Sequence, residues 1–458
     1  MIGYGIGYIG DGSTYNFMSA YFVVFLTNCV GMNSSLAAAV SSIALLVEVI
    51  AGMIVGHVSD NCNSRMGRRR PFILVSAICM PVIMVMIMRT IHASAPVMFL
   101  YYLVLSILFR AVFATYEIPV GAFGAEIATG YDERTSLRTI TRAFSILGST
   151  VGYVMPLMIL DLFQTEAEGW QAIGTIIAIA CGASWLGTFF LTRSYAANPQ
   201  EHEKRQDKII RNIIKSYIEL SKLKTMRILI VYKAAFTCAF SLFNVGTVYY
   251  LQNCLGLGNK YSSYMYILTI CVFVVMTPVA GKMALRLGKA VQQKIIFLFS
   301  GTVGCIVYFT IPETLAGGVM YIIAFAMTQT SFWQLSNSIF YDVVEVDEFE
   351  NSKRREGDIM SMVSVLGTLI TAIIVQLFGV FLEVFGFNPT LEIQPESVKI
   401  FLNASYILVP SICFIIGYFA LKVFPVNKDT FSSLLKALEL RRRGKDYSRY
   451  MEDVKKLL

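Results

Sequence analysis

Six ionisable side chains lie inside stretches of this 458-residue chain that are otherwise apolar: Asp11, Glu48, Arg110, Glu117, Arg142 and Lys233. A charge held near the centre of a bilayer costs about 3 kcal/mol or more, so membrane proteins rarely keep one there without a function. Acids and bases in such surroundings can pair with each other, bind a proton or bind a polar solute. The six residues therefore indicate a polar pathway through a helical membrane protein, with static ion pairs between helices as the alternative.

The composition supports a membrane location for the whole chain. Hydrophobic residues make up 56% of the sequence and charged residues only 15%, whereas a soluble domain carries about 25% charged residues. We count twelve apolar runs, each near the roughly 20 residues that a helix needs to cross the hydrocarbon. The first run lacks a basic start and a cleavage site, so we interpret it as a span and not as a signal peptide. The sequence predicts an all-α membrane protein with twelve transmembrane helices.

Basic residues alternate along the chain in step with these spans. Most of the 38 lysine and arginine residues lie in loops after even-numbered spans and in the carboxyl tail, while the loops after odd-numbered spans hold only Arg89, Lys260 and Lys399. Cytoplasmic loops carry such an excess of positive charge. We therefore expect both termini in the cytoplasm, and we interpret the net charge of +8 as a topology signal and not as a nucleic-acid-binding surface.

The longest polar connection divides the chain near its middle. We predict an amino-terminal six-helix bundle at 1–192, a cytoplasmic amphipathic linker at 193–226, a carboxyl-terminal six-helix bundle at 227–425 and a cytoplasmic tail at 426–458. The linker and the tail are both basic and amphipathic, which is typical of helices that lie on the inner leaflet. Binding of a regulatory protein is the alternative for both segments.

The residue pattern gives no sign of a metal centre, a cofactor or an enzyme. The nine cysteines show no paired spacing and the three histidines are dispersed along the chain, which excludes a recognisable disulfide framework or metal site. A phosphate-binding glycine loop and a serine nucleophile elbow are also missing from the sequence. We therefore expect no enzymatic activity, no cofactor and no metal.

The loop after the second span contains the elements of a gate. Asp60 falls at the end of that span, Gly67 permits a tight turn, and Arg65 and Arg68 supply partners for the carboxylate. An acid at this position can also interact with the positive end of a neighbouring helix. A related run of small and basic residues follows the eighth span at 281–289, and such a repeat is typical of transporters built from two halves.

Segment 56–72 resembles the loop signature of the major facilitator superfamily. With segments 4–10, 117–122, 131–138, 342–350 and 353–357, in order and at similar spacing, the chain resembles the glycoside-pentoside-hexuronide:cation symporters, the family of the bacterial melibiose carrier. The three arginines before Pro71 also resemble the loop of sucrose:proton symporters. The resemblance implies the major facilitator fold, alternating access, and a second set of gating residues at Asp342, Glu345 and Arg354.

The resemblance also implies positions for the solute site. The acid of the fourth span falls on Glu117, the arginine of the fifth on Arg142, and the aromatic platform of the tenth on Trp333. Asp11 lies one place before the acid of the first span, about 100° away around the helix. From the residues themselves, Gln334 and Asn337 are candidate partners for solute hydroxyl groups.

The cation site of the family is only partly present. Its positions correspond here to Glu48, Ala51, Gly52 and Ala114, so one carboxylate is left where sodium needs several oxygen ligands. A single buried carboxylate suits a proton better. We therefore expect proton coupling through Glu48, Glu117 and Asp11, with sodium coupling as the alternative.

Arg110 and Lys233 lie outside the matched pattern. They either neutralise acids in ion pairs or bind an anionic solute such as a hexuronide. The sequence thus predicts a secondary transporter that imports a sugar, glycoside or hexuronide with H+, working as a monomer in the cytoplasmic membrane. A carrier of amphiphilic, lipid-type solutes and a non-transporting nutrient sensor are the remaining alternatives.

Overall fold

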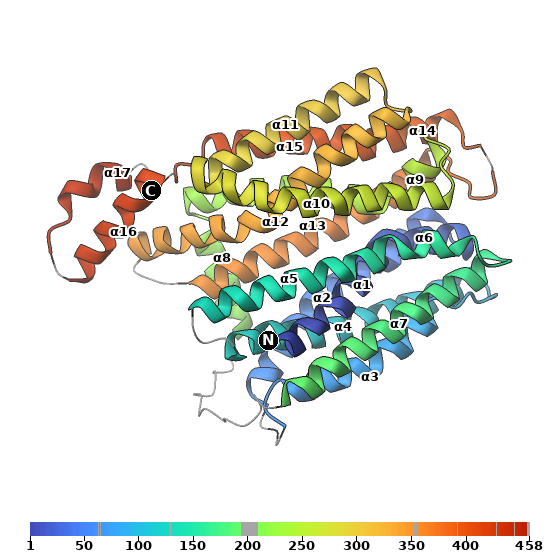
Figure 1. Ribbon diagram of the computed structural model, residues 1–458, viewed down its shortest axis with the longest axis horizontal. Coiled ribbons are helices and arrows are strands. Elements are labelled where there is room, and N and C mark those ends of the chain that lie inside the picture. The colour runs from blue at the N-terminus through green and yellow to red at the C-terminus, as the bar shows by residue number, and fades with distance from the viewer. Residues whose placement is uncertain are drawn as a thin grey trace. The chain divides into compact units, whose positions relative to one another are not determined.

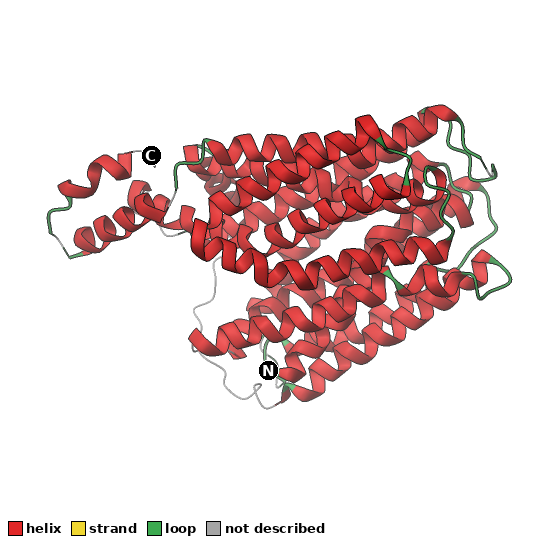
Figure 2. Ribbon diagram, turned by 45° about the horizontal axis from the view of Figure 1, so that its top comes forward, coloured by secondary structure: helices red, strands yellow, loops and turns green. Residues whose placement is uncertain are grey.

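The computed structural model describes residues 1–62, 64, 66–127, 131–193, 209–351, 355–391, 393–426, 428–443 and 445–455. Throughout these ranges every regular element is a helix (Figure 2). Short π-helical turns extend two of the helices at Phe25–Cys29 and Ala404–Leu408, and a short 3-10 turn lies at Ser448–Tyr450. The α-helices are α1 (Ile2–Val24), α2 (Ser34–Asp60), α3 (Arg70–Ile87), α4 (Ala95–Ile127), α5 (Tyr131–Tyr153), α6 (Met155–Leu160), α7 (Glu166–Leu191), α8 (Ile209–Leu220), α9 (Lys224–Asn253), α10 (Asn259–Leu287), α11 (Lys289–Thr310), α12 (Leu315–Asn351), α13 (Glu356–Val384), α14 (Glu396–Asn403), α15 (Val409–Lys422), α16 (Lys428–Arg442) and α17 (Met451–Lys455).

The long helices account for the predicted spans. Eleven helical segments of the described chain are long and apolar enough to cross a membrane, among them α5 with α6 and α14 with α15, each pair forming one crossing. Helix α1 is not among these eleven, because five glycines and Asp11 make it less apolar, yet its 23 residues suffice for a span. With α1 the structure accommodates the twelve spans, and the predicted all-α membrane fold is confirmed.

The chain forms two compact units. Unit 1 contains residues 1–205 together with 244–267 and 371–402, and unit 2 contains 206–243, 268–370 and 403–458. Helices α9, α10 and α13 therefore contribute to both units. The division of the sequence into two six-helix halves at 192, 226 and 425 stays a prediction.

In unit 1, α1 packs closely between α5 and α7 (Figure 1). A side chain at Gly148 of α5 would collide with the carbonyl oxygen of Ile9, and one at Gly152 with that of Ser13. Small residues four apart let two helix backbones approach in this way inside a membrane. Asn16 of α1 donates to the Ser149 hydroxyl at 2.8 Å beside this contact. The close packing fixes the rotation of α1.

Aromatic rings position α4 beside α1 and α7 in the same unit. The Tyr116 ring stacks on Trp185 of α7 at 3.8 Å between centroids. The Tyr4 hydroxyl of α1 donates to the carbonyl oxygen of Val120 at 2.8 Å. Helix α4 also packs on α2 and α3. These contacts fix the register of α4, on which two of the charged residues lie.

In unit 2, α9 and α12 are locked together by stacked rings. Phe236 stacks on Phe332 at 3.5 Å and Phe243 stacks on Phe325 at 3.9 Å. Helix α12 also packs on α11, where Gln292 donates to the Ser331 hydroxyl at 2.8 Å. Rigid stacking of this kind holds the side chains of α9 and α12 in fixed positions relative to each other.

Candidate functional site

Glu48 of α2 and Arg110 of α4 form an ion pair in unit 1. The Nη1 atom of Arg110 lies 3.0 Å from Oε2 of Glu48, and the two side chains are only 10% and 16% exposed. The guanidinium also lies 5.7 Å from the centre of the Phe109 ring. This geometry corresponds to the ion-pair role that the sequence left open for Arg110.

Glu117 lies two helical turns beyond Arg110 on α4 and is exposed. It interacts electrostatically with Asp11, Glu48 and Arg110. We call these four residues the carboxylate cluster. Tyr15 of α1 interacts with three of them, Glu48, Arg110 and Glu117. The cluster therefore combines three carboxylates with one arginine, so one acid is neutralised and two are left.

Asp11 of α1 is the least satisfied member of the carboxylate cluster. Its Oδ1 atom is buried and accepts no hydrogen bond from any described residue. Outside the cluster, Asp11 interacts electrostatically with Tyr8 of α1, Tyr116 of α4 and Cys181 of α7. A buried carboxylate oxygen without a partner is costly. Binding of a proton or a cation would remove this cost.

Arg142 of α5 is exposed. Among the residues that the structure describes, none forms an ion pair with it, and in particular Glu117 does not. The predicted joint action of Glu117 and Arg142 on one solute stays a prediction.

Lys233 of α9 lies beside two aromatic rings of α12 in unit 2. Its Nζ atom lies 5.2 Å from the centre of the Phe332 ring and 5.2 Å from that of Trp333, both on α12. Trp333 is 42% exposed. Gln334 and Asn337, on the same helix, are exposed as well. Across the described chain, no carboxylate lies within ion-pair distance of Lys233.

The predicted gating residues are only partly within the described chain. Arg65 and Arg354 lie outside the described residues, as does the side chain of Asp60. Gly67 adopts a φ of 89°, the left-handed conformation that a glycine turn needs, and Arg68 is half-buried. Asp342 of α12 pairs with Lys289 at 2.7 Å, and Glu345 is half-buried.

Lys289 is a partner that the sequence did not assign. Besides Asp342, it donates to the carbonyl and the hydroxyl of Ser338 at 3.1 and 3.0 Å. The ring of Phe431 in α16 lies 5.8 Å from its Nζ atom. The same tail helix anchors on the end of α12, where Arg441 donates to the carbonyl oxygen of Phe349 at 2.6 Å.

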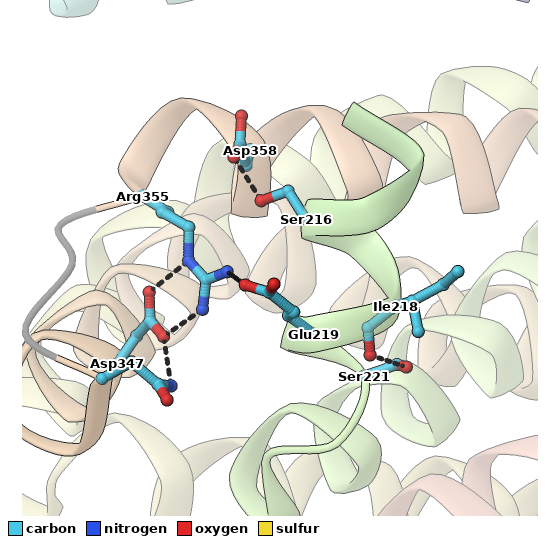
Figure 3. A network of polar contacts seen from close by, with 8 residues as sticks. Ser216, Ile218, Glu219, Ser221, Asp347, Arg355 and Asp358 are labelled. Carbon is cyan, nitrogen blue, oxygen red and sulfur yellow. Dashed lines mark hydrogen bonds and ion pairs between the residues drawn. The ribbon is translucent and has the colours of Figure 1, made fainter. Parts of the chain in front are cut away.

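A second network joins the linker helix α8 to α12 (Figure 3). Arg355 donates to both oxygens of Asp347, at 2.9 and 2.6 Å, and to Glu219 of α8 at 2.7 Å. The hydrogen bonds to Asp347 raise the pKa of Arg355 above its usual range, so the guanidinium is charged at every physiological pH. Ser216 of α8 also donates to Asp358. Asp347 and Arg355 lie in the segments 342–350 and 353–357 that carry the family resemblance, but no sequence pattern pairs them with Glu219 of the linker.

Comparison with known proteins places the chain among sugar carriers. The family model of MFS/sugar transport proteins matches residues 3–428. The "Uncharacterized symporter YjmB" of Bacillus subtilis is 23% identical over 435 residues, covering 91% of this chain and 90% of the relative. The "Putative glycoside/cation symporter YagG" of Escherichia coli is 20% identical over 423 residues, covering 90% and 88%. The "Glucuronide carrier protein homolog" of Escherichia coli is 19% identical over 467 residues, covering 97% and 96%.

Solved transporter structures share the fold. A bacterial homologue of the human drug peptide transporters PepT1 and PepT2 superposes with a TM-score of 0.66. The match covers 96% of this chain and 98% of that one at 14% identity. At this level of identity the likeness concerns the fold alone.

Proposed function

This chain belongs to the family of MFS/sugar transport proteins, and we propose that it imports a sugar or glycoside together with protons. Membership makes it a multi-pass secondary transporter of the symporter type, with the major facilitator fold. The proposal adds the coupling ion, the direction of transport and the residues that perform it. The three relatives have names that include a glycoside/cation symporter and a glucuronide carrier homolog, which support solute and cation cotransport.

The carboxylate cluster is the observation that carries proton coupling. With Glu48 paired to Arg110, the acids left to take up a proton are Asp11 and Glu117, which repel each other when both are charged. A single proton relieves this repulsion and satisfies the buried oxygen of Asp11. A sodium ion would need several oxygen ligands, but one of the three acids, Glu48, is already paired with Arg110.

In this proposal the solute is bound by side chains of the spans, most of them exposed. Glu117 and Arg142 bind hydroxyl groups, and Trp333 packs against the sugar ring. Asp11, Gln334 and Asn337 add polar contacts. A carboxylate can accept hydrogen bonds from two hydroxyl groups, and these charge-assisted bonds are strong.

The gate and the location complete the proposal. One cytoplasmic gate follows the second span and consists of Asp60, Arg65, Gly67 and Arg68. The corresponding gate in the second half consists of Asp342, Glu345 and Arg354. The protein works as a monomer in the cytoplasmic membrane with both termini inside. Support comes from the basic loops after even-numbered spans and from the bacterial relatives.

Uptake into proteoliposomes tests the proposal. Radiolabelled glycosides, pentosides and hexuronides are offered under an imposed proton gradient and then under a sodium gradient, to the native chain and to Glu117→Gln. We expect one solute class to accumulate with protons, and Glu117→Gln to lose this accumulation. Uptake that follows sodium and ignores pH would overturn the proton assignment. Absence of any sugar uptake would overturn the solute assignment in favour of an amphiphilic solute or a sensor.

A further inference from the structure

A row of side chains on α1 runs from the carboxylate cluster to the start of the helix. Tyr4, Tyr8, Asp11 and Tyr15 follow each other at steps of four, three and four residues, so they share one helix face. We propose that Tyr8 and Tyr4 form a proton relay, through which Asp11 releases its proton to the cytoplasmic side. The inference rests on the proposed function, because it names the route of the proton that the symport requires.

The inner end of the row lies in the carboxylate cluster. Tyr15 interacts electrostatically with Glu117, and Tyr8 interacts with Asp11, which lies three residues further along α1. The buried Oδ1 atom of Asp11 accepts no hydrogen bond from any described residue, which makes it a site for a proton. The seven residues from Asp11 to Tyr4 correspond to about 10 Å along the helix. A proton moves in one step only between groups within hydrogen-bond distance or across one water molecule, so this path needs an intermediate carrier.

The two phenols form a hydrogen-bonded chain with a fixed direction. The hydroxyl oxygens of Tyr4 and Tyr8 lie 3.1 Å apart, and Tyr4 donates to the carbonyl oxygen of Val120 at 2.8 Å. Because a phenol has one hydroxyl hydrogen, and Tyr4 gives its own to Val120, Tyr8 is the donor between the two tyrosines. Both hydroxyl hydrogens therefore point away from Asp11 and toward the start of α1, the end that the charge pattern assigns to the cytoplasm.

Proton release through this chain is a sequence of matched transfers. Asp11 gives its proton to the hydroxyl oxygen of Tyr8, Tyr8 gives its own hydrogen to Tyr4, and Tyr4 gives its hydrogen to water. Each O–H bond that breaks is matched by one that forms, so both tyrosines end as neutral phenols and Asp11 ends as a carboxylate. Rotation of the two hydroxyl groups then restores the starting arrangement.

Helix α4 closes the outer end of the chain. Tyr4 is only 3% exposed, and its ring meets Phe123 edge to face at 6.3 Å. A side chain at Gly124 would collide with the Tyr4 hydroxyl, so the glycine leaves the room that this hydroxyl occupies. The carbonyl oxygen of Val120 thus stands where a water molecule would accept the proton. Release requires the Tyr4 hydroxyl to turn from Val120 to water, which makes this contact the gate of the relay.

Two titratable groups of other helices also interact with Asp11, Tyr116 of α4 and Cys181 of α7. Both are fully buried, and the Tyr116 ring is held by its stack on Trp185 at 3.8 Å. Tyr8, in contrast, is half-buried and hydrogen-bonded to the next phenol of the row. Of the three neighbours, Tyr8 is therefore the one that continues toward the end of α1.

The test compares proton-driven accumulation with solute exchange in proteoliposomes, for the radiolabelled glycoside, pentoside or hexuronide that the native chain accumulates. Accumulation requires a proton to be released in every cycle, whereas exchange of labelled for unlabelled solute proceeds with the proton still bound. Tyr8→Phe removes the hydroxyl and keeps the ring. It should lower the maximum rate of accumulation about 100-fold, the lower end of what a positioned proton-transfer group contributes, and leave KM and exchange unchanged. Tyr261→Phe, a change of a 59% exposed tyrosine of α10, is the matched control and should affect neither measurement.

A second variant keeps the inference testable if Tyr8→Phe does not insert. Tyr4→Phe removes the next hydroxyl of the chain and should likewise lose accumulation and keep exchange. Accumulation at the native rate in these variants overturns the relay alone, because the proton then reaches Asp11 through water. Loss of accumulation and exchange together also overturns it, because the hydroxyl groups then serve the solute site or the fold. A native chain that accumulates no sugar under a proton gradient overturns the proposed function.

Discussion

At the scale of single residues, the role of Glu48 separates two versions of the mechanism. Its ion pair with Arg110 is buried, and removing one partner of a buried pair costs about 3–5 kcal/mol because the other charge is left alone. We expect Arg110→Gln to destabilise the protein by about this amount. Thermal unfolding in detergent measures the loss. The double variant Glu48→Gln with Arg110→Gln should recover most of the stability, because no isolated charge remains.

The same double variant decides whether Glu48 also carries a proton. If the pair is structural, proton-driven uptake in the double variant persists, because Asp11 and Glu117 still bind the proton. If uptake is lost while stability is recovered, Glu48 belongs to the proton path. If Glu48→Gln alone is stable and active, the ion pair between Glu48 and Arg110 is not needed for stability.

At the scale of helices, the contact between α1 and α5 depends on glycine. A side chain at Gly148 would meet the carbonyl oxygen of Ile9, a backbone atom that cannot move aside without shifting α1. We expect Gly148→Ala to destabilise the protein by about 1–3 kcal/mol through overpacking. Gly121→Ala in α4 is the matched control, because open space surrounds that position. It should be neutral or stabilising in the same thermal unfolding measurement.

The linker helix α8 forms one ion pair with the half-buried Arg355, beside hydrogen bonds from Ser216 and Tyr217. Asp347 is fully buried, so Arg355→Gln leaves its carboxylate without a charged partner and should cost about 3–5 kcal/mol. It should also release α8, which faster proteolysis of the linker would report. Arg443→Gln is the control, because its pair with Glu439 is largely exposed and contributes about 0–1 kcal/mol. Equal effects of the two substitutions would contradict a role for α8 docking.

The pH dependence of this contact follows from the arginine. A group whose pKa is raised on folding stabilises the protein below its unfolded pKa and loses this effect only as the pH rises through the folded value. Hydrogen bonds to Asp347 raise the pKa of Arg355 from a value that is already far above neutrality. The guanidinium therefore gives the docking of α8 no pH dependence in the physiological range. Any proton sensitivity of transport must come from other groups.

The sequence predicted the helices well and their contacts poorly. Apolar runs and alternating basic loops fix how often the chain crosses the membrane, because both follow from local composition. The pairing of Glu48 with Arg110 joins residues 62 positions apart and depends on the rotation of α2 and α4, which no local pattern specifies. The same holds for Lys289 with Asp342 and for Arg355 with Glu219. The resemblance to a known family supplied candidate residues but not the partners that hold them.

At the scale of the whole molecule, unit 1 joins segments from the two halves of the sequence. The hydroxyl groups of Thr27 and Tyr249 lie 2.6 Å apart, and Tyr153 donates to Asn244 at 2.7 Å. These contacts lie near loops that follow odd-numbered spans, which the charge pattern assigns to the outside. In the proposed alternating-access cycle, we expect contacts between the two predicted halves to break and contacts within one half to persist.

Asn259 allows this idea to be tested with a matched pair of cross-links. It donates to Asp161 of the first half at 2.6 Å and accepts from Gln252 of its own half at 2.8 Å. In a background without the nine native cysteines, we expect a disulfide between Asp161→Cys and Asn259→Cys to stop uptake and a reductant to restore it. A disulfide between Gln252→Cys and Asn259→Cys should leave uptake intact, because it ties α9 to α10 within one half. Full uptake with the first disulfide closed would mean that the two halves do not separate at this point.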